Sequence, residues 1–260
     1  MKVTLIQMDI EWENPTENRH RAQELMLSAP KSDLYVLPEM FTTGFAVHKG
    51  GALEPHDGPT HRWIKKMAQR LDAAVTGSVA VVTENGDSRN RMYFVKPDGS
   101  IRYYDKHHLF TYGGEDKLYT QGTEKTIVEW RGVRFMLQVC YDLRFPVFVR
   151  NTMQPDEDGK NLRPLYDCCI YVANWPESRR RVWDVLTRAR AIENQCFILA
   201  ANRVGDDPVC HYDGGSVVVD AYGKDVAVAT DNQQMTITAE LDMERLERFR
   251  KKFPVLADGD

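Results

Sequence analysis

The feature of this sequence that most restricts its fold is the alternation of short apolar runs with amphipathic segments of helical period. In the N-terminal third, strands are predicted at Val3–Ile10, Leu34–Leu37 and Ala73–Val82, and helices begin at Asn14-Pro15 and Gly58-Pro59. Proline at the first helical position is a common start signal, and each apolar run has the length of a buried strand. This order is typical of an α/β fold, in which helices cover the faces of a sheet.

From Arg91 onward the pattern changes to strand-like runs that are separated by turn residues. Four runs form two pairs, around Pro97-Asp98-Gly99 and around Arg131-Gly132: Met92–Val95, Ile101–Asp105, Lys125–Trp130 and Val133–Val139. Runs joined by such turn signals are expected to pair as neighbouring antiparallel strands.

The remaining third returns to alternation after an irregular stretch. A helix is predicted from Cys140 to about Met153, and the polar segment Pro155–Pro164 is expected to be a solvated loop. The elements predicted after it are the strands Asp167–Ala173, Cys196–Asn202, Ser216–Asp220, Asp225–Ala229 and Met235–Leu241 and the helices Ser178–Asn194 and Met243–Lys252. Because strands outnumber helices, two central sheets covered outside by helices are the economical packing. Residues 1–260 are predicted to form one domain, since no repeat or linker divides them.

The composition limits the classes of partner. The formal net charge is −4 with both signs interspersed, so neither nucleic acid nor a membrane is expected as a partner. No apolar stretch approaches the roughly 20 residues that span a bilayer, and Met1–Met8 lacks the features of a signal peptide. The five cysteines form an odd set that favours free thiols in a reducing compartment, and CxxC and HExxH spacings are missing. We therefore expect a cytoplasmic protein that acts on small molecules and holds no metal.

Three polar residues follow directly after predicted buried strands, where loops build the sites of α/β folds. Glu39 lies in Leu37-Pro38-Glu39-Met40-Phe41, Lys106 in Tyr104-Asp105-Lys106-His107-His108, and Cys140 in Val139-Cys140-Tyr141-Asp142-Leu143-Arg144-Phe145-Pro146. They are the candidates for the chemistry of this chain.

Cys140 is the candidate nucleophile. Most free cysteines are small core residues, and Cys168, Cys169 and Cys196 fit that description because they lie inside apolar strands. Cys140 instead ends a strand where a helix is predicted to begin, and a helix N-terminus lowers the pKa of a thiol. We therefore expect Cys140 to be the reactive cysteine.

Glu39 and Lys106 are the candidates for proton transfer and charge stabilisation. Glu39 is flanked by apolar residues, so burial would raise its pKa toward the range of a general base that takes a thiol proton. Most lysines are simply solvated, but an ammonium beside a reacting carbonyl stabilises the oxyanion of a tetrahedral intermediate. The backbone N–H of Tyr141 could supply a second donor to that oxyanion.

The ordered set of Glu39, Lys106 and Cys140 in these segments resembles the nitrilase, or carbon–nitrogen hydrolase, superfamily. The resemblance covers nearly the whole chain, and within the superfamily it is closest to bacterial omega-amidases. Further segments that agree with it are Gly77-Ser78-Val79, Val172-Ala173-Asn174-Trp175-Pro176, Arg188-Ala189-Arg190-Ala191-Ile192-Glu193-Asn194-Gln195 and Asn202-Arg203-Val204-Gly205.

This resemblance implies a four-layer α-β-β-α sandwich, usually dimerised, so a homodimer is expected. It implies Glu39 as base, Cys140 as nucleophile and Lys106 as the third catalytic residue, with Glu115 matching a second glutamate of the family, although Asp116 is adjacent. The implied reaction is hydrolysis of the terminal amide of small carboxylic acids, such as 2-oxoglutaramate or 2-oxosuccinamate, through a thioester on the cysteine. The product acid and ammonia form without a metal or organic cofactor.

Substrate contacts are harder to assign from the sequence. The candidates lie in segments that resemble site-lining loops: Phe45, Tyr141, Arg144, Trp175 and Arg203. An anionic substrate calls for an arginine, whose planar fork matches a carboxylate. Arg144 and Arg203 are both open as that arginine, and Arg144 could instead pair with Glu193.

Other functions remain open at this point. Within the superfamily they are a true nitrilase, an N-carbamoyl amino acid hydrolase or an amide-forming transferase. A papain-like enzyme with His107 or His108 as base is a rival, although the local papain signature is missing. A binding protein that keeps the fold without the chemistry is a rival from a different class.

Overall fold

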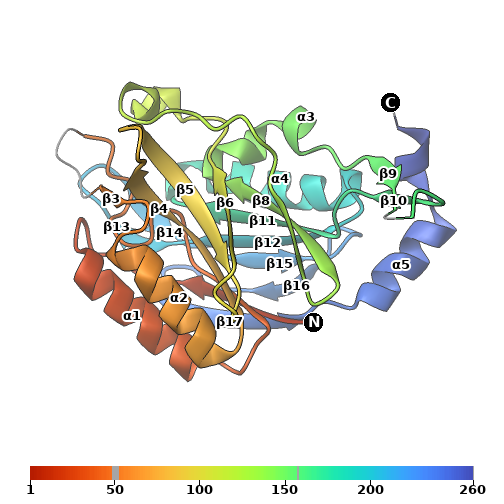
Figure 1. Cartoon of the computed structure of the whole chain (residues 1–260), viewed down its shortest axis with the longest axis horizontal. Coiled ribbons are helices and arrows are strands. Elements are labelled where there is room, and N and C mark those ends of the chain that lie inside the picture. Colours follow the sequence, from red (N-terminus) through yellow and green to blue (C-terminus); the bar gives the residue numbers. More distant parts are fainter. Residues whose placement is uncertain (49–52, 157, 260) are drawn as a thin grey trace.

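The structure is a computed structural model that describes residues 1–48, 53–156 and 158–259. Two β-sheets lie face to face at its centre, and helices cover their outer faces (Figure 1). Side chains from both sheets form one apolar core between them, in which the ring centres of Phe94 and Phe135 lie 5.8 Å apart. The predicted four-layer α-β-β-α sandwich is therefore confirmed.

The first sheet contains the N-terminal strands. Among the described residues its order is β17-β1-β2-β4-β5-β6, with β3 paired to β4. β1, β2 and β4 run parallel, whereas β17, β5 and β6 join antiparallel. The bounds of these strands are β1 (Lys2–Gln7), β2 (Leu34–Val36), β3 (Glu54–Pro55), β4 (Ala74–Val82), β5 (Ser88–Val95), β6 (Ile101–Asp105) and β17 (Met235–Glu240).

The second sheet has the order β16-β15-β12-β11-β8-β7. Its central strands β8, β11 and β12 are parallel, so their carboxyl ends meet at one edge. The bounds are β7 (Ile127–Trp130), β8 (Val133–Val139), β11 (Cys168–Ala173), β12 (Phe197–Asn202), β15 (Val217–Val219) and β16 (Asp225–Val228). A separate hairpin follows β12 and consists of β13 (Val204–Asp206) and β14 (His211–Asp213).

The helices form the two outer layers. α1 (Pro15–Ser28) and α2 (Pro59–Leu71) pack on the first sheet, and α4 (Arg180–Glu193) packs on the second. Asn14 caps α1, because its side chain accepts a hydrogen bond from the N–H of Glu17 at 3.2 Å. These helices begin where the sequence pattern predicted, within two residues.

The prediction of a helix from Cys140 to about Met153 is wrong. The chain instead forms a 3₁₀ turn, η3 (Cys140–Arg144), and one helical turn, α3 (Pro146–Val149). The residue before a proline is disfavoured in helical conformation, so Pro146 divides the segment.

The solvated loop expected over Pro155–Pro164 is wrong at both of its ends. β9 (Met153–Pro155) pairs there with β10 (Leu162–Pro164) as a hairpin. Strands of two or three residues, including β3, β13 and β14, are too short to show the alternation that predicts a strand.

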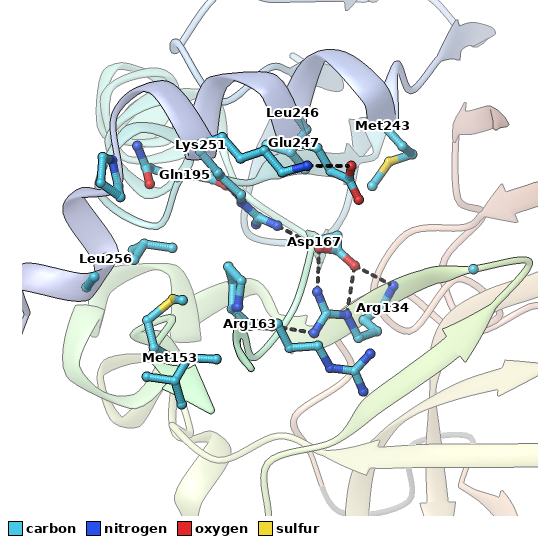
Figure 2. A pocket seen from close by; sticks show the side chains of 16 residues that line it. Arg134, Met153, Arg163, Asp167, Gln195, Met243, Leu246, Glu247, Lys251 and Leu256 are labelled. Carbon is cyan, nitrogen blue, oxygen red and sulfur yellow. Dashed lines mark hydrogen bonds and ion pairs between the residues drawn. The ribbon is translucent and has the colours of Figure 1, made fainter. Parts of the chain in front are cut away.

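An ion-pair network joins the C-terminal helix α5 (Met243–Lys252) to the second sheet (Figure 2). Asp167 accepts hydrogen bonds from Arg134 of β8 at 2.7 and 2.9 Å and from Arg250 of α5 at 2.7 Å. The network lines a cavity of about 520 Å³ between the β9–β10 hairpin and α5. Burial alone would raise the pKa of Asp167, but the two guanidinium groups outweigh it and hold that pKa below its ordinary value.

Asp167→Asn should therefore lower the free energy of unfolding by about 3 kcal/mol, because it leaves two largely buried guanidinium groups without their shared carboxylate. The pKa of Asp167 is depressed in the fold, so its contribution is present above the unfolded value of about 4 and is lost as pH falls through the folded value. Urea unfolding at pH 7 and at pH 3 to 4 measures both effects. Glu244→Gln is the control, because this side chain is 90% exposed beside Arg248 and should change stability by less than about 0.5 kcal/mol. Equal stability of the two variants at pH 7 contradicts the prediction.

Candidate active site

The structure brings Glu39, Lys106, Glu115 and Cys140 together, although they lie far apart in the sequence. Glu39 follows β2, Lys106 follows β6, and Cys140 follows β8 of the opposite sheet. The Nζ atom of Lys106 is 2.9 Å from Oε1 of Glu39 and 2.8 Å from Oε2 of Glu115. All three ionic side chains are at most 1% exposed.

Backbone and amide donors fix the two carboxylates. The Nδ2 group of Asn90 donates to Oε1 of Glu39 at 2.8 Å and to Oε1 of Glu115 at 3.0 Å. The N–H of Asn174 donates to Oε2 of Glu39 at 2.8 Å, and the N–H of Phe110 donates to Oε2 of Glu115 at 2.6 Å. The carboxylates are therefore oriented by groups outside the cluster as well as by the lysine.

The charges of this buried cluster depend on one another. Burial alone would lower the pKa of Lys106, but the negative charges of Glu115 and Glu39 outweigh it, so that pKa is raised and the side chain is an ammonium. The pKa of Glu115 is raised, mainly by burial and further by the charge of Glu39, while Lys106 acts in the opposite direction. Asp116, the alternative to Glu115 in the sequence, is exposed.

Cys140 occupies a strained turn at the end of β8. Its φ of 45° is in the left-handed region, which non-glycine residues rarely adopt and which is frequent at functional sites. Its Sγ lies 4.0 Å from the carbonyl oxygen of Asn174, at the end of the neighbouring strand β11.

The expected lowering of the pKa of the Cys140 thiol is wrong. Burial raises that pKa well above its ordinary value, and the charge of Glu39 adds to the effect, while Lys106 opposes it. The N-terminus of the predicted helix would have lowered this pKa, but the chain forms the short turn η3 there instead. Burial and the neighbouring carboxylate therefore both favour the neutral thiol over the thiolate.

Asp142 connects the segment of Cys140 to the segment of Lys106. Its Oδ2 accepts from the hydroxyl of Tyr104 at 2.8 Å and from the N–H of Val139 at 3.0 Å. Its Oδ1 accepts from the backbone N–H of His108 at 2.9 Å and lies 2.8 Å from Nδ1 of the same residue. This buried carboxylate holds the ends of β6 and β8 together.

The two histidines proposed as alternative bases have other partners. Nδ1 of His107 lies 2.7 Å from the carbonyl oxygen of Gly122, and its ring stacks on Phe148 at 4.0 Å. The ring of His108 stacks on Phe145 at 3.8 Å. Neither lines the cavity that contains Cys140, so the geometry disfavours a papain-like pair.

That cavity has a volume of about 690 Å³. Of the predicted substrate contacts, four line it: Phe45, Tyr141, Arg144 and Trp175. The guanidinium carbon of Arg144 lies 5.1 Å from the ring centre of Trp175, while Glu193 pairs with Arg190 at 3.0 Å. Arg144 therefore lines the cavity, and Glu193, its alternative partner in the sequence, pairs with Arg190 instead.

Arg203 lies outside the cavity lining. Its side chain is 0% exposed, and it donates to the carbonyl oxygens of Ile10 at 2.8 Å and of Val204 at 3.0 Å. Its guanidinium lies beneath the ring of Tyr212, with the guanidinium carbon 4.5 Å from the ring centre. Tyr212 itself lines the cavity, so Arg203 supports a wall of the site.

The residues of the site that were not singled out from the sequence include Asn90, Phe110 and Arg179. Asn90 lies between two arginines in β5, Phe110 follows the segment of Lys106, and Arg179 belongs to a run of three arginines. No local pattern distinguishes them, because their importance depends on contacts with distant segments. Cys210 also lines the cavity, whereas Cys168, Cys169 and Cys196 are buried in the core.

Two further observations concern the described residues alone. None of the described helices is both long enough and apolar enough to cross a membrane. Across residues 1–48, 53–156 and 158–259, histidine, cysteine, aspartate and glutamate form no group of three or more that could hold a metal ion.

Comparison with known proteins identifies the family. The family model for carbon-nitrogen hydrolases matches residues 2–251. The chain is similar to omega-amidase YafV of Yersinia enterocolitica, at 44% identity over 100% of this chain and 97% of the relative. It is also similar to 2-oxoglutaramate amidase of Bacillus subtilis, at 32% identity over 98% of this chain and 96% of the relative.

A solved structure agrees with these matches. A carbon-nitrogen hydrolase superfamily protein of Xanthomonas campestris, which carries an arsenic adduct in its active site, is 43% identical. The two structures superpose with a TM-score of 0.94 over 100% of this chain and 97% of the other. The chain belongs to the carbon–nitrogen hydrolase family. The predicted nitrilase superfamily is thereby confirmed, and bacterial omega-amidases are among the relatives.

Glu39→Gln should lower the pKa of the Cys140 thiol, because it removes a neighbouring negative charge while Lys106 remains. The rate of alkylation by iodoacetamide, measured by mass mapping in a Cys210→Ser background, should reach its plateau at a pH lower by about one unit. The buried Cys168, Cys169 and Cys196 should stay unlabelled. Asp116→Asn, on the exposed neighbouring loop, should leave the profile of Cys140 unchanged. A plateau at the same or a higher pH in Glu39→Gln would show that Glu39 does not set the protonation of this thiol.

Proposed function

We propose that this protein is an omega-amidase that hydrolyses the terminal amide of small 2-oxo acids, such as 2-oxoglutaramate and 2-oxosuccinamate. The observation that carries the proposal is the thiol of Cys140 in one cavity with a buried carboxylate–ammonium cluster and the guanidinium of Arg144. The relatives named omega-amidase and 2-oxoglutaramate amidase support the same activity. The products are the dicarboxylic acid and ammonia.

In the first half of the reaction, Glu39 accepts the proton of Cys140 and the thiolate adds to the amide carbon. The negative charge moves to the carbonyl oxygen, where Lys106 and the N–H of Tyr141 stabilise it. Collapse of this intermediate breaks the carbon–nitrogen bond, and Glu39 returns the proton to the leaving nitrogen as ammonia departs. A thioester remains on Cys140.

In the second half, water hydrolyses the thioester. Glu39 takes a proton from the water as its oxygen adds to the thioester carbon, and Lys106 and Tyr141 again stabilise the oxyanion. The carbon–sulfur bond then breaks, and the proton held by Glu39 returns to the sulfur. Glu115 keeps Lys106 charged and in place, which its contacts of 2.8 and 3.1 Å with the ammonium support.

The rest of the cavity binds the substrate. Arg144 is the proposed partner of the substrate carboxylate, and the aromatic rings of Phe45 and Trp175 surround the carbon chain. Arg203 was an equal candidate in the sequence, and its buried contacts with backbone carbonyls support an indirect part through Tyr212.

We further propose a single carbon–nitrogen hydrolase domain over residues 1–260 that acts as a cytoplasmic homodimer without a cofactor. The family match over residues 2–251 supports the single domain. Free thiols support a reducing compartment. Exposed apolar side chains on α4, Val185 and Ile192, and on the edge strand β16, Val226 and Val228, support a partner subunit on this face.

Ammonia release from a panel of amides tests the activity. The value of kcat/KM should be highest for 2-oxoglutaramate or 2-oxosuccinamate, lower for glutamine and lowest for aliphatic amides and nitriles, because the last two lack the carboxylate that pairs with Arg144. Cys140→Ala should abolish turnover of every substrate. If a nitrile or an N-carbamoyl amino acid exceeds every omega-amide, the chain has a different activity within the same superfamily.

The neighbours Glu115 and Asp116 provide a matched pair for the second glutamate. Glu115→Gln should lower kcat on the order of 10²-fold, because the ammonium loses one of its two carboxylates and its position beside the oxyanion. Asp116→Asn should leave kcat unchanged, since that side chain is exposed. Circular dichroism and thermal unfolding of both variants check the fold. Normal turnover by folded Glu115→Gln would remove Glu115 from the mechanism.

A further inference from the structure

Arg179 is a second guanidinium in the active-site cavity, and the reaction described above gives it no role. It ends the 3₁₀ turn η4 (Glu177–Arg179), is half-buried, and lies with its guanidinium carbon 5.3 Å from the ring centre of Phe110. Its carbonyl oxygen accepts a hydrogen bond from Nε1 of Trp175 at 2.8 Å. The indole of Trp175 therefore contacts both cavity arginines: its N–H binds the backbone of Arg179, and the guanidinium of Arg144 lies over its ring.

The two cavity arginines contact aromatic rings. Among the residues that the structure describes, no carboxylate forms an ion pair with Arg144 or Arg179, and their guanidinium groups lie over the rings of Trp175 and Phe110. An arginine held on an aromatic face keeps its N–H donors available in the plane of the guanidinium. Two such groups in one cavity are suited to an oxygen-rich, negatively charged ligand.

The other charged groups of the cavity offset these two cations only in part. Asp207 adds one negative charge, and its carboxylate is held in place by hydrogen bonds from the N–H groups of Val209 at 2.7 Å and of Cys210 at 2.6 Å, and from the hydroxyl of Tyr212. Lys106 is held between two carboxylates. The half-buried part of the cavity thus has an excess of positive charge, which favours anions and disfavours a ligand ammonium.

We propose that Arg179 is a specificity-determining residue which, together with Arg144, selects 2-oxo acid amides over the corresponding 2-amino acid amides. This inference rests on the proposed omega-amidase function. A 2-oxo acid presents three oxygen acceptors and no positive charge, so two guanidinium groups bind its carboxylate and its neighbouring carbonyl. A 2-amino acid of the same length places an ammonium beside the carboxylate, where the two guanidinium groups repel it.

The test compares 2-oxoglutaramate with glutamine, which differ only at the carbon next to the carboxylate. In Arg179→Gln, KM for 2-oxoglutaramate should rise on the order of tenfold with kcat nearly unchanged, because the arginine contacts the substrate away from the scissile amide. The ratio of kcat/KM between the two substrates should fall by a similar factor. Arg179→Lys should keep most of that ratio, because the positive charge remains.

Arg181→Gln is the matched control, because Arg181 belongs to the same run of three arginines but is exposed and does not line the cavity. It should leave both substrates unaffected. A ratio that is unchanged in Arg179→Gln, or that falls equally in Arg181→Gln, overturns this inference while the omega-amidase function stands. Absence of ammonia release from every omega-amide by the unmodified protein overturns the proposed function, and this inference with it.

Discussion

The buried ammonium of Lys106 between the carboxylates of Glu39 and Glu115 is the interaction on which the rest of the site depends. Removing three charges from water costs several kcal/mol for each ion, and only close pairing and additional hydrogen bonds offset that cost. Here the Nζ atom of Lys106 lies within 2.9 Å of each carboxylate, and Asn90 and the backbone supply the remaining donors. Removal of Lys106 would leave two buried carboxylates without a cation, whereas removal of either glutamate would leave a single ion pair.

The net negative charge of this cluster also determines the state of the nucleophile. Cys140 lies in a buried position where burial and the charge of Glu39 both favour the neutral thiol. In the proposed mechanism the thiolate forms when Glu39 accepts the proton of Cys140.

The face-to-face packing of the two sheets makes this arrangement possible. β6 and β8 belong to different sheets, yet the carboxylate of Asp142 accepts hydrogen bonds from both of their ends. Charge is distributed unevenly around the resulting cavity: carboxylates surround the buried end at Cys140, and the guanidinium groups of Arg144 and Arg179 line the half-buried part. A small molecule with a neutral amide at one end and a carboxylate at the other matches this distribution.

The sequence by itself determined the succession of strands and helices, because apolar periodicity and caps such as Asn14-Pro15 act over a few neighbouring residues. It also indicated Glu39, Lys106 and Cys140, since each follows a buried strand in a recognisable segment. Only the tertiary structure decided that Glu115 rather than Asp116 contacts the lysine, that Arg144 and Arg179 line the cavity while Arg203 does not, and that the thiol pKa is raised. These properties depend on distances and burial set by residues far away in the chain, and electrostatic interactions at such distances leave no local pattern in the sequence.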